Sequence, residues 1–343
     1  MRGLGLAWQD ALGAVFIAGL LFLLIALSGL RRYIITAIPK ALNMAITTGL
    51  GLFIALIALR NAGMQIPGIN SGVHPAHFGL QMALFFVGLM TIAACSYYRA
   101  PGAILVGILV TTLLGLLFGL CHFHGVFSLP PSIAPTLLHF RFDHLLSLQG
   151  LSVIFAFLFV TLFDCTGTLV GLLSEAKLID RTDTQQRMAR GLVATSIATV
   201  CGGALGTSST SPYLESATGI NVGGRTGVTA FVVGGLFILA LFLSPLAATI
   251  PNFATAPALL FVGCLMMRNI TSINWSDYTE LIPSLITVLV IPYTLSIADG
   301  VGAGILSYTI LKIICRKRNE LNATLIVLSL LFIFYFLLQM SLL

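Results

Sequence analysis

Long apolar runs constrain this chain more than any other feature of its sequence. A helix that crosses a membrane needs about 20 mostly apolar residues, and eleven runs approach or exceed that length. A twelfth run is shorter and is interrupted by polar residues. The eleven runs lie near 11–30, 42–59, 79–95, 102–120, 148–173, 191–206, 226–248, 254–267, 281–297, 300–315 and 323–343, and the interrupted run covers 207–221. The sequence therefore predicts an all-α polytopic membrane protein.

The composition excludes the main classes of soluble protein. Hydrophobic residues make up 58% of the chain, only 8% of the residues are charged, and the mean hydropathy is +1.04, whereas a soluble domain carries roughly a quarter charged residues. The six cysteines form no C-x-x-C pair. No nucleophile–base pair, metal cluster or phosphate-binding loop is evident, so we expect neither an enzyme nor a cofactor, and no nucleic-acid partner.

The positive charges predict the orientation of the spans. Cytoplasmic loops carry an excess of Lys and Arg. If Arg31 and Arg32 lie inside, only Arg2, Arg60 and Arg141 fall outside, so fourteen of the seventeen basic residues face the cytoplasm. This bias requires the interrupted run to count as one crossing, and it places the N-terminus outside.

An internal repeat is visible along the chain. Four matches follow one another in order: Phe16 and Phe22 with Phe231 and Phe237, 38–39 with 250–251, 52–61 with 260–269, and 107–114 with 304–311. Because Arg60 falls outside and Arg268 inside, the two copies have opposite orientations. An inverted-topology repeat of this kind is the architecture of many secondary transporters.

Seven crossings separate the two copies, so the predicted repeat unit has seven spans. We expect residues 1–147 to hold spans 4–7 of the first repeat, and residues 148–316 to hold spans 8–14 of the second, with a half-helix near 207–221. Residues 317–343 are an extra hydrophobic segment. The expected fold is a seven-plus-seven inverted repeat in which about eleven repeat spans are present and three N-terminal spans are missing.

Three of the eleven acidic residues do not fall at span ends or in obvious loops: Asp164, Glu215 and Asp299. An ionisable side chain at membrane depth is costly unless it is paired or faces a cavity, so it marks a functional site by default. Asp164 lies mid-span beside the small polar residues Thr166 to Thr168 and is a site candidate. Asp299 lies between two runs, where we expect a turn.

Glu215 follows a polar run, residues 207–213, inside an apolar region. Such a run cannot face lipid. Ser211 suits a helix N-cap and Pro212 the first helical position, which predicts a short extended piece followed by a half-helix. The free amides of Tyr213, Leu214 and Glu215 would then face the protein interior, where they can bind a polar ligand.

Four histidines crowd one loop on the outside: His122, His124, His139 and His144. Their spacing matches no usual metal-binding pattern. We expect a surface loop without a metal.

Several segments resemble the AzgA-like purine permeases of the nucleobase–ascorbate transporter superfamily. The similar runs are FDCTGTLVG (163–171), TSSTSPYLESATGINVGGRTG (207–227), GLGLFIALIALRNAG (49–63) and ATAPALLFVG (254–263). The resemblance extends over essentially the whole chain. It implies fourteen helices in core and gate domains, and proton-coupled uptake of adenine, guanine or hypoxanthine.

The resemblance also implies roles for residues of this sequence. The acids that face the substrate fall on Asp164 and Glu215, which would bind the base and carry the proton. Thr168 lies one helical turn after Asp164, and the amides of Tyr213 and Leu214 complete the polar edge. Family members carry three further helices before the point where this chain begins.

The sequence thus predicts a purine nucleobase permease of the bacterial cytoplasmic (inner) membrane that works by alternating access. The expected partners are a purine, a proton or other cation, the lipid bilayer and, as a candidate, a second copy of the chain. Two alternatives stay open. One is a shortened remnant that no longer transports, and the other is an anion transporter of the same architecture, which two acidic residues in the site disfavour.

Overall fold

The structure is a computed structural model, and it is helical wherever it describes regular secondary structure. It describes residues 7–28, 39–64, 79–98, 100, 102–142, 145, 147–176, 178, 183–213, 216–221 and 223–340. No strand occurs among these residues. The all-α class predicted from the apolar runs is therefore confirmed.

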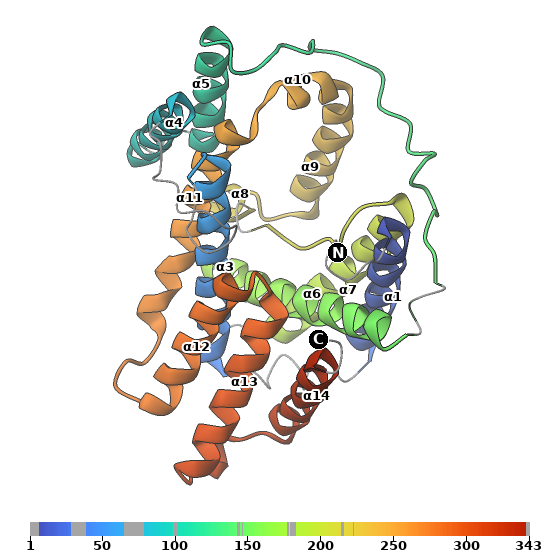
Figure 1. The fold of residues 1–343 in the computed structure, drawn as a ribbon, viewed down its shortest axis with the longest axis vertical. Helices are drawn as coiled ribbons and strands as arrows, with labels where there is room; N and C mark the ends of the chain where they lie inside the picture. Colours follow the sequence, from blue (N-terminus) through green and yellow to red (C-terminus); the bar gives the residue numbers. More distant parts are fainter. Residues whose placement is uncertain are drawn as a thin grey trace. The chain divides into compact units, whose positions relative to one another are not determined.

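The helices follow the predicted runs closely (Figure 1). In the described ranges, seven helices are long and apolar enough to cross a membrane, and four apolar helices are shorter. The α-helices are α1 (Trp8–Leu27), α3 (Lys40–Asn61), α4 (Leu80–Tyr97), α5 (Ala103–Leu117), α6 (Leu148–Glu175), α7 (Thr184–Leu205), α8 (Ser216–Asn221), α9 (Gly227–Ala240), α10 (Ser244–Thr249), α11 (Asn252–Met267), α12 (Tyr278–Thr294), α13 (Ile297–Ile314) and α14 (Ala323–Met340). Three short 3₁₀ turns are η1 (Leu241–Leu243), η2 (Arg268–Ser272) and η3 (Arg318–Glu320). Residues 227–249 form one membrane-length apolar segment through α9, η1 and α10.

The chain divides into two compact units, each of which takes segments from both predicted repeats. Unit 1 contains Met1–Thr47, Ser132–Arg225 and Ser272–Leu343, and unit 2 contains Thr48–Pro131 and Thr226–Thr271. The predicted repeat boundaries at residues 147 and 316 stay a prediction.

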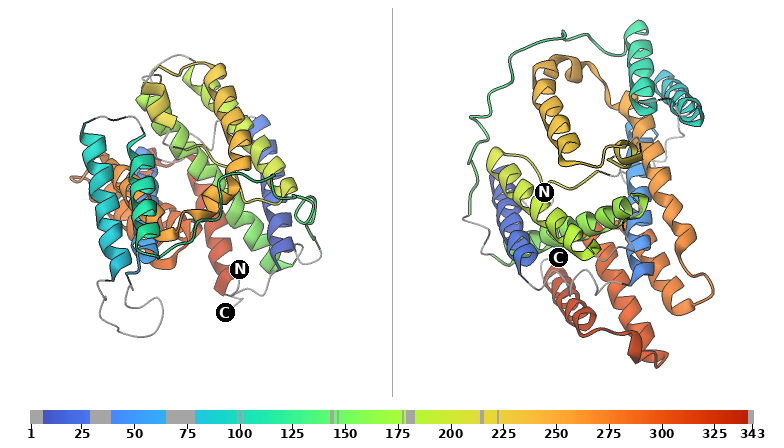
Figure 2. Two further views of the ribbon diagram at one scale, coloured as in Figure 1. Left: turned by 90° about the horizontal axis from the view of Figure 1, so that it is seen from above. Right: turned by 180° about the vertical axis from the view of Figure 1, so that it is seen from behind.

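In unit 1, α1 packs along α7 and α6, and the views of Figures 1 and 2 both show α1 beside α7. Small residues permit the close approach. A Cβ atom added to Gly203 would lie 3.1 Å from the Cα atom of Phe16, and one added to Gly19 would lie 3.1 Å from the backbone nitrogen of Val200. Lipid supplies little hydrophobic driving force between helices, so close van der Waals packing at small residues stabilises such pairs.

The predicted extra segment is an integral part of unit 1. Helix α14 packs against α13 and α6, and Phe332 on it is fully buried. The Tyr335 ring stacks on Phe155 of α6, with ring centroids 5.6 Å apart. The Tyr335 hydroxyl donates a hydrogen bond of 3.0 Å to the Oδ1 atom of Asp299 on α13. One aromatic residue of α14 therefore joins two other helices.

Asp299 lies at a helix boundary, as predicted. It occupies the first turn of α13, and its amide donates to the Ser296 hydroxyl, which caps the helix at 3.2 Å. The neighbouring Leu295 has φ +55°, so the chain turns sharply between α12 and α13.

In unit 2, two segments that the repeat makes equivalent meet each other. The repeat aligns Ala55 of α3 with Gly263 of α11. A Cβ atom added to Gly263 would lie 2.7 Å from the Gly51 carbonyl oxygen and 3.2 Å from the Ala55 Cβ atom. Equivalent positions of two related segments can meet close to the axis that relates them, and this contact agrees with the predicted repeat.

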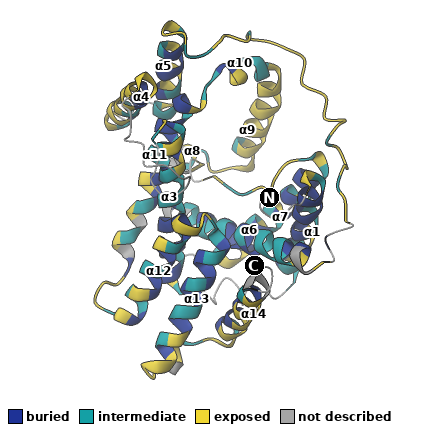
Figure 3. Cartoon of the chain, viewed as in Figure 1, coloured by how far each residue is buried: buried dark blue, intermediate teal, exposed yellow. Residues whose placement is uncertain are grey.

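Helix α9 presents an apolar surface on every side. None of its residues is buried, whereas ten residues of α1 are buried, a contrast that the burial colours of Figure 3 show. The sequence makes α9 and α1 repeat equivalents. Phe231 and Phe237 on α9 are 84% and 69% exposed, which suits a helix that faces lipid.

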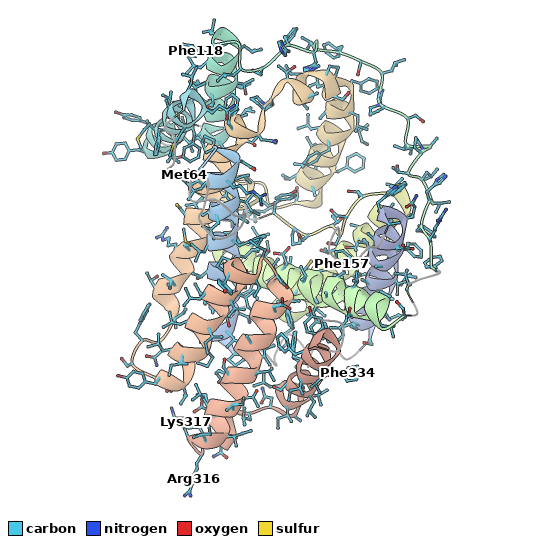
Figure 4. All side chains as sticks on the ribbon, viewed as in Figure 1. Met64, Phe118, Phe157, Arg316, Lys317 and Phe334 are labelled. Atoms are coloured by element: carbon cyan, nitrogen blue, oxygen red, sulfur yellow. The ribbon has the colours of Figure 1, made fainter. Side chains whose placement is uncertain are left out.

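An ion cluster joins the ends of α12 and α13 in unit 1. The Lys312 ammonium, which is fully buried, lies 2.5 Å from the Oε2 atom of Glu320 and 3.9 Å from the Oδ2 atom of Asp277. Lys317, seen at the end of α13 in Figure 4, donates to the same Asp277 oxygen at 2.6 Å. Asp277 also caps α12 by accepting from the Thr279 amide at 2.9 Å.

This cluster predicts a defined dependence of stability on pH. The hydrogen bond from Lys317, together with those from Thr279, holds the pKa of Asp277 well below its ordinary value of 3.8. A lowered pKa in the folded state contributes stability above the unfolded value and loses it as the pH falls through the folded value. Asp277→Asn keeps a capping side chain but removes the charge, so we expect its melting temperature to be about 2–4 °C below that of the wild type at pH 7.

The melting temperature of both proteins would be measured in detergent between pH 3 and pH 8. The difference should stay constant above about pH 5 and shrink below pH 4. Asp183→Asn is the control, because Asp183 forms an exposed ion pair with Arg187 of the same helix. A difference that grows as the pH falls would contradict the account.

Candidate functional site

The candidate site begins with two polar residues on one face of α6. Asp164 is half-buried and Thr168 is 7% exposed, and the two lie one helical turn apart, so their side chains share a face. The flanking Phe163 and Cys165 are buried in the apolar core of unit 1. The helix forms here because the run is apolar and carries strong helix formers, and Asp164 is the one acid in its middle.

The polar run after α7 is extended, as predicted, but its helix starts later than predicted. Residues 207–213 adopt no helix, and α8 begins at Ser216. The prediction that Ser211 caps a helix with Pro212 at its first position is therefore wrong. The reason is that the hydroxyl-rich run contacts neighbouring helices: the Thr210 hydroxyl donates to the Ala198 carbonyl of α7, and Ser211 lies close to Asp164 of α6.

The extended run approaches α6 at Asp164. The Ser211 side chain lies close enough to the Asp164 carboxylate to interact with it. Directly beside it, the Thr195 hydroxyl of α7 interacts with the Cys165 thiol. Sequence reasoning missed Ser211 as a partner of Asp164. The sequence did hold one indication of this contact. Residues 207–211 are five consecutive hydroxyl residues, and an acid in the middle of a span needs a polar partner.

Of the other predicted site residues after α7, the structure describes Tyr213 but not Leu214 or Glu215. Tyr213 follows Ser211 by two residues, its side chain is 72% exposed, and its carbonyl accepts from the Ser216 amide at 3.2 Å. Leu214 and Glu215 lie outside the described residues. Asp164 and Thr168 thus share one face of α6, and Ser211 lies close to Asp164.

The site can offer hydrogen-bond acceptors and hydroxyl donors. Its described side chains are one carboxylate and several hydroxyls, and neither Lys nor Arg occurs in 161–171 or 207–213. A neutral ligand with N–H donors and ring acceptors matches this set better than an anion, which the carboxylate repels.

The described part of the histidine loop brings no metal-binding group together. His122, His124 and His139 are exposed, and His144 lies outside the described residues. In the part of the chain that the structure describes, no group of three or more His, Cys, Asp or Glu side chains could hold a metal ion. The prediction of a surface loop is confirmed for the three described histidines.

Comparison with known proteins places this chain among permeases. Residues 3–302 match the Permease family, whose short name is Xan_ur_permease. Adenine permease AdeQ of Escherichia coli is 39% identical over 333 residues, which cover 96% of this chain and 74% of AdeQ. Guanine/hypoxanthine permease PbuO of Bacillus subtilis is 36% identical over 335 residues, covering 96% of this chain and 77% of PbuO.

A solved structure supports the fold. The transmembrane domain of the cyanobacterial bicarbonate transporter BicA matches with a TM-score of 0.61 and 18% identity, covering 87% of this chain and 76% of that domain. At this identity the likeness shows the transporter fold and carries no information about the substrate. The apolar helices and the family match together make the chain an integral, multi-pass membrane protein, and its relatives are transporters rather than enzymes. The chain belongs to the Permease family, within the nucleobase–ascorbate transporter superfamily.

Proposed function

We propose that this chain is a purine nucleobase permease that takes up adenine, guanine or hypoxanthine together with a proton by alternating access. One observation carries the proposal: Asp164 of a membrane-length helix meets the hydroxyl-rich extended segment 207–213. Its relatives are named adenine or guanine/hypoxanthine permeases. A purine edge offers N–H donors and ring nitrogen acceptors, which this combination of groups matches.

The proposed roles follow from chemistry and position. Asp164 accepts an N–H of the base, and Thr168 contributes a hydroxyl from the same face of α6. The amides of Tyr213 and Leu214 donate to ring acceptors. Glu215 is the second acidic ligand. Burial disfavours a charged carboxylate, so an acid at this depth takes up a proton readily and is suited to couple proton entry to transport.

The proposed location is the bacterial cytoplasmic membrane, with the Lys- and Arg-rich loops inside. The same charge pattern gives the direction of each span. The two predicted repeats then supply the moving parts, because rocking of one bundle against another exposes a fixed site to each side in turn.

Uptake by cells tests the proposal. Cells that lack their own purine permeases would express this chain, and uptake of radiolabelled adenine, guanine and hypoxanthine would be measured. We expect saturable uptake of at least one purine, lost in Glu215→Gln at equal membrane expression. Absence of uptake from well-expressed protein would reject the proposal in favour of a non-transporting remnant. Uptake of an anion such as bicarbonate would favour the anion transporter instead.

A further inference from the structure

The extended segment 207–213 is attached to α7 by contacts that the proposed site does not itself use. Helix α7 ends at Gly206, which has φ +93°. The Gly206 amide donates to the Gly203 carbonyl at 3.2 Å, and the Thr207 amide donates to the Gly202 carbonyl at 2.9 Å. This pair of bonds is a Schellman motif, and it turns the chain back along the helix it has just left.

The returning segment runs antiparallel to the last turns of α7. Three extended residues, from 207 to 210, span about 10 Å. Seven helical residues, from 199 to 206, also rise about 10 Å. Thr210 should therefore lie level with Thr199, and the hydrogen bonds between these residues show that it does.

The Thr199 hydroxyl serves both backbone groups of Thr210. It accepts from the Thr210 amide at 3.3 Å and donates to the Thr210 carbonyl at 3.1 Å, sharing its hydrogen with the Thr195 carbonyl at 3.0 Å. Thr199 is 1% exposed. Backbone groups in the hydrocarbon region of a membrane have no water to bond to, and here a single side chain satisfies both backbone groups of Thr210.

A glycine makes the contact possible. A Cβ atom added to Gly202 would lie 3.2 Å from the Thr210 hydroxyl oxygen and 3.3 Å from the Ser208 carbonyl oxygen. The segment therefore lies directly on the helix surface. Its register along α7 is set at Thr199.

We propose that Thr199 is a positioning residue: its hydroxyl fixes the register of segment 207–213 on α7 and thereby holds Ser211 against Asp164. Ser211 follows Thr210 directly along the chain and lies close to Asp164. The inference rests on the proposed function, because Ser211 adjoins Asp164, the proposed ligand of the purine.

Three variants test the role of the hydroxyl. Thr199→Val keeps the shape but removes the hydroxyl, which leaves the amide and the carbonyl of Thr210 without this partner, and we expect KM for the purine to rise roughly tenfold or more. Thr199→Ser retains the hydroxyl and should stay within about threefold of the wild type. The matched control is Ser196→Ala, because Ser196 is fully buried on the same helix and its hydroxyl donates only to the Val193 carbonyl of that helix.

The positioning role predicts a change mainly in KM, with Vmax per transporter at the membrane largely retained. A merely structural defect would instead lower the amount of folded protein and leave KM unchanged. Uptake would therefore be measured over a range of purine concentrations and normalised to surface expression.

Hydrogen exchange gives a readout that needs no substrate. In purified protein, the peptide that contains the Thr210 amide should exchange much faster in Thr199→Val than in the wild type, and Thr199→Ser and Ser196→Ala should show wild-type protection. Unchanged exchange in Thr199→Val, or an unchanged KM despite faster exchange, would overturn the inference. If the wild type takes up no purine, the proposed function fails and the positioning role fails with it. Faster exchange in Thr199→Val would in that case still show that Thr199 attaches segment 207–213 to α7.

Discussion

Asp164→Asn is expected to lower purine uptake, measured as Vmax/KM, by about two orders of magnitude or more. The substitution keeps the shape of the side chain and removes its charge. A hydrogen bond to a charged group contributes about 1.5–3 kcal/mol, which corresponds to roughly 10- to 150-fold. The amide also cannot carry a proton, so loss of coupling adds to the loss of binding. Uptake of radiolabelled purine in permease-deficient cells measures the effect.

The control for this variant is Asp183→Asn. Asp183 is exposed and pairs with Arg187 at 2.7 Å, so its charge should have little effect on transport. Both variants should reach the membrane in wild-type amounts. Wild-type uptake by Asp164→Asn would contradict the proposal that the Asp164 carboxylate binds the purine.

The second large effect is expected on folding, at the contact between α12 and α13. A Cβ atom on Gly300 would meet the Ile291 side chain and lie 2.9 Å from the Ile291 backbone nitrogen. Because backbone cannot move aside as a side chain can, even Gly300→Ala must push the two helices apart. Overpacking of this kind costs typically 1–3 kcal/mol, and Gly300→Leu should abolish accumulation of folded protein.

Gly234 provides the matched control for that prediction. It also lies in an apolar helix, α9, and a Cβ atom there meets nothing within 4 Å. Gly234→Ala should keep the wild-type melting temperature, whereas Gly300→Ala should lower it by several degrees. The check is a thermal unfolding curve of purified protein in detergent. Equal melting temperatures for the two alanine variants would contradict the packing of α12 on α13.

Much of the fold follows from the sequence because lipid imposes a simple rule. A span must be long, apolar and internally hydrogen-bonded, so the apolar runs predicted the helices within a few residues. The run 102–120, for instance, contains α5 at Ala103–Leu117. The repeat also predicted that α3 and α11 are related, and their contact at Gly51 and Gly263 agrees with it.

The details of the site were less accessible from sequence. Ser211 and Pro212 form a good local helix start, yet α8 begins at Ser216. The Thr199 hydroxyl that bonds to Thr210, and Asp164, which lies close to Ser211, are on other helices and cannot be identified from the local sequence pattern. The packing of α14 was missed for the same reason, since the bond from Tyr335 to Asp299 joins residues 36 positions apart.

Transport by purified protein in liposomes tests the central claim most directly. Wild-type protein and Asp164→Asn would be reconstituted, an inward proton gradient imposed, and the accumulation of radiolabelled adenine, guanine and hypoxanthine followed over time. The account predicts that at least one purine accumulates against its gradient in wild-type liposomes, that a protonophore abolishes the accumulation, and that Asp164→Asn shows none. Folded wild-type protein that accumulates none of the three purines, or accumulates them equally with and without the proton gradient, would contradict it.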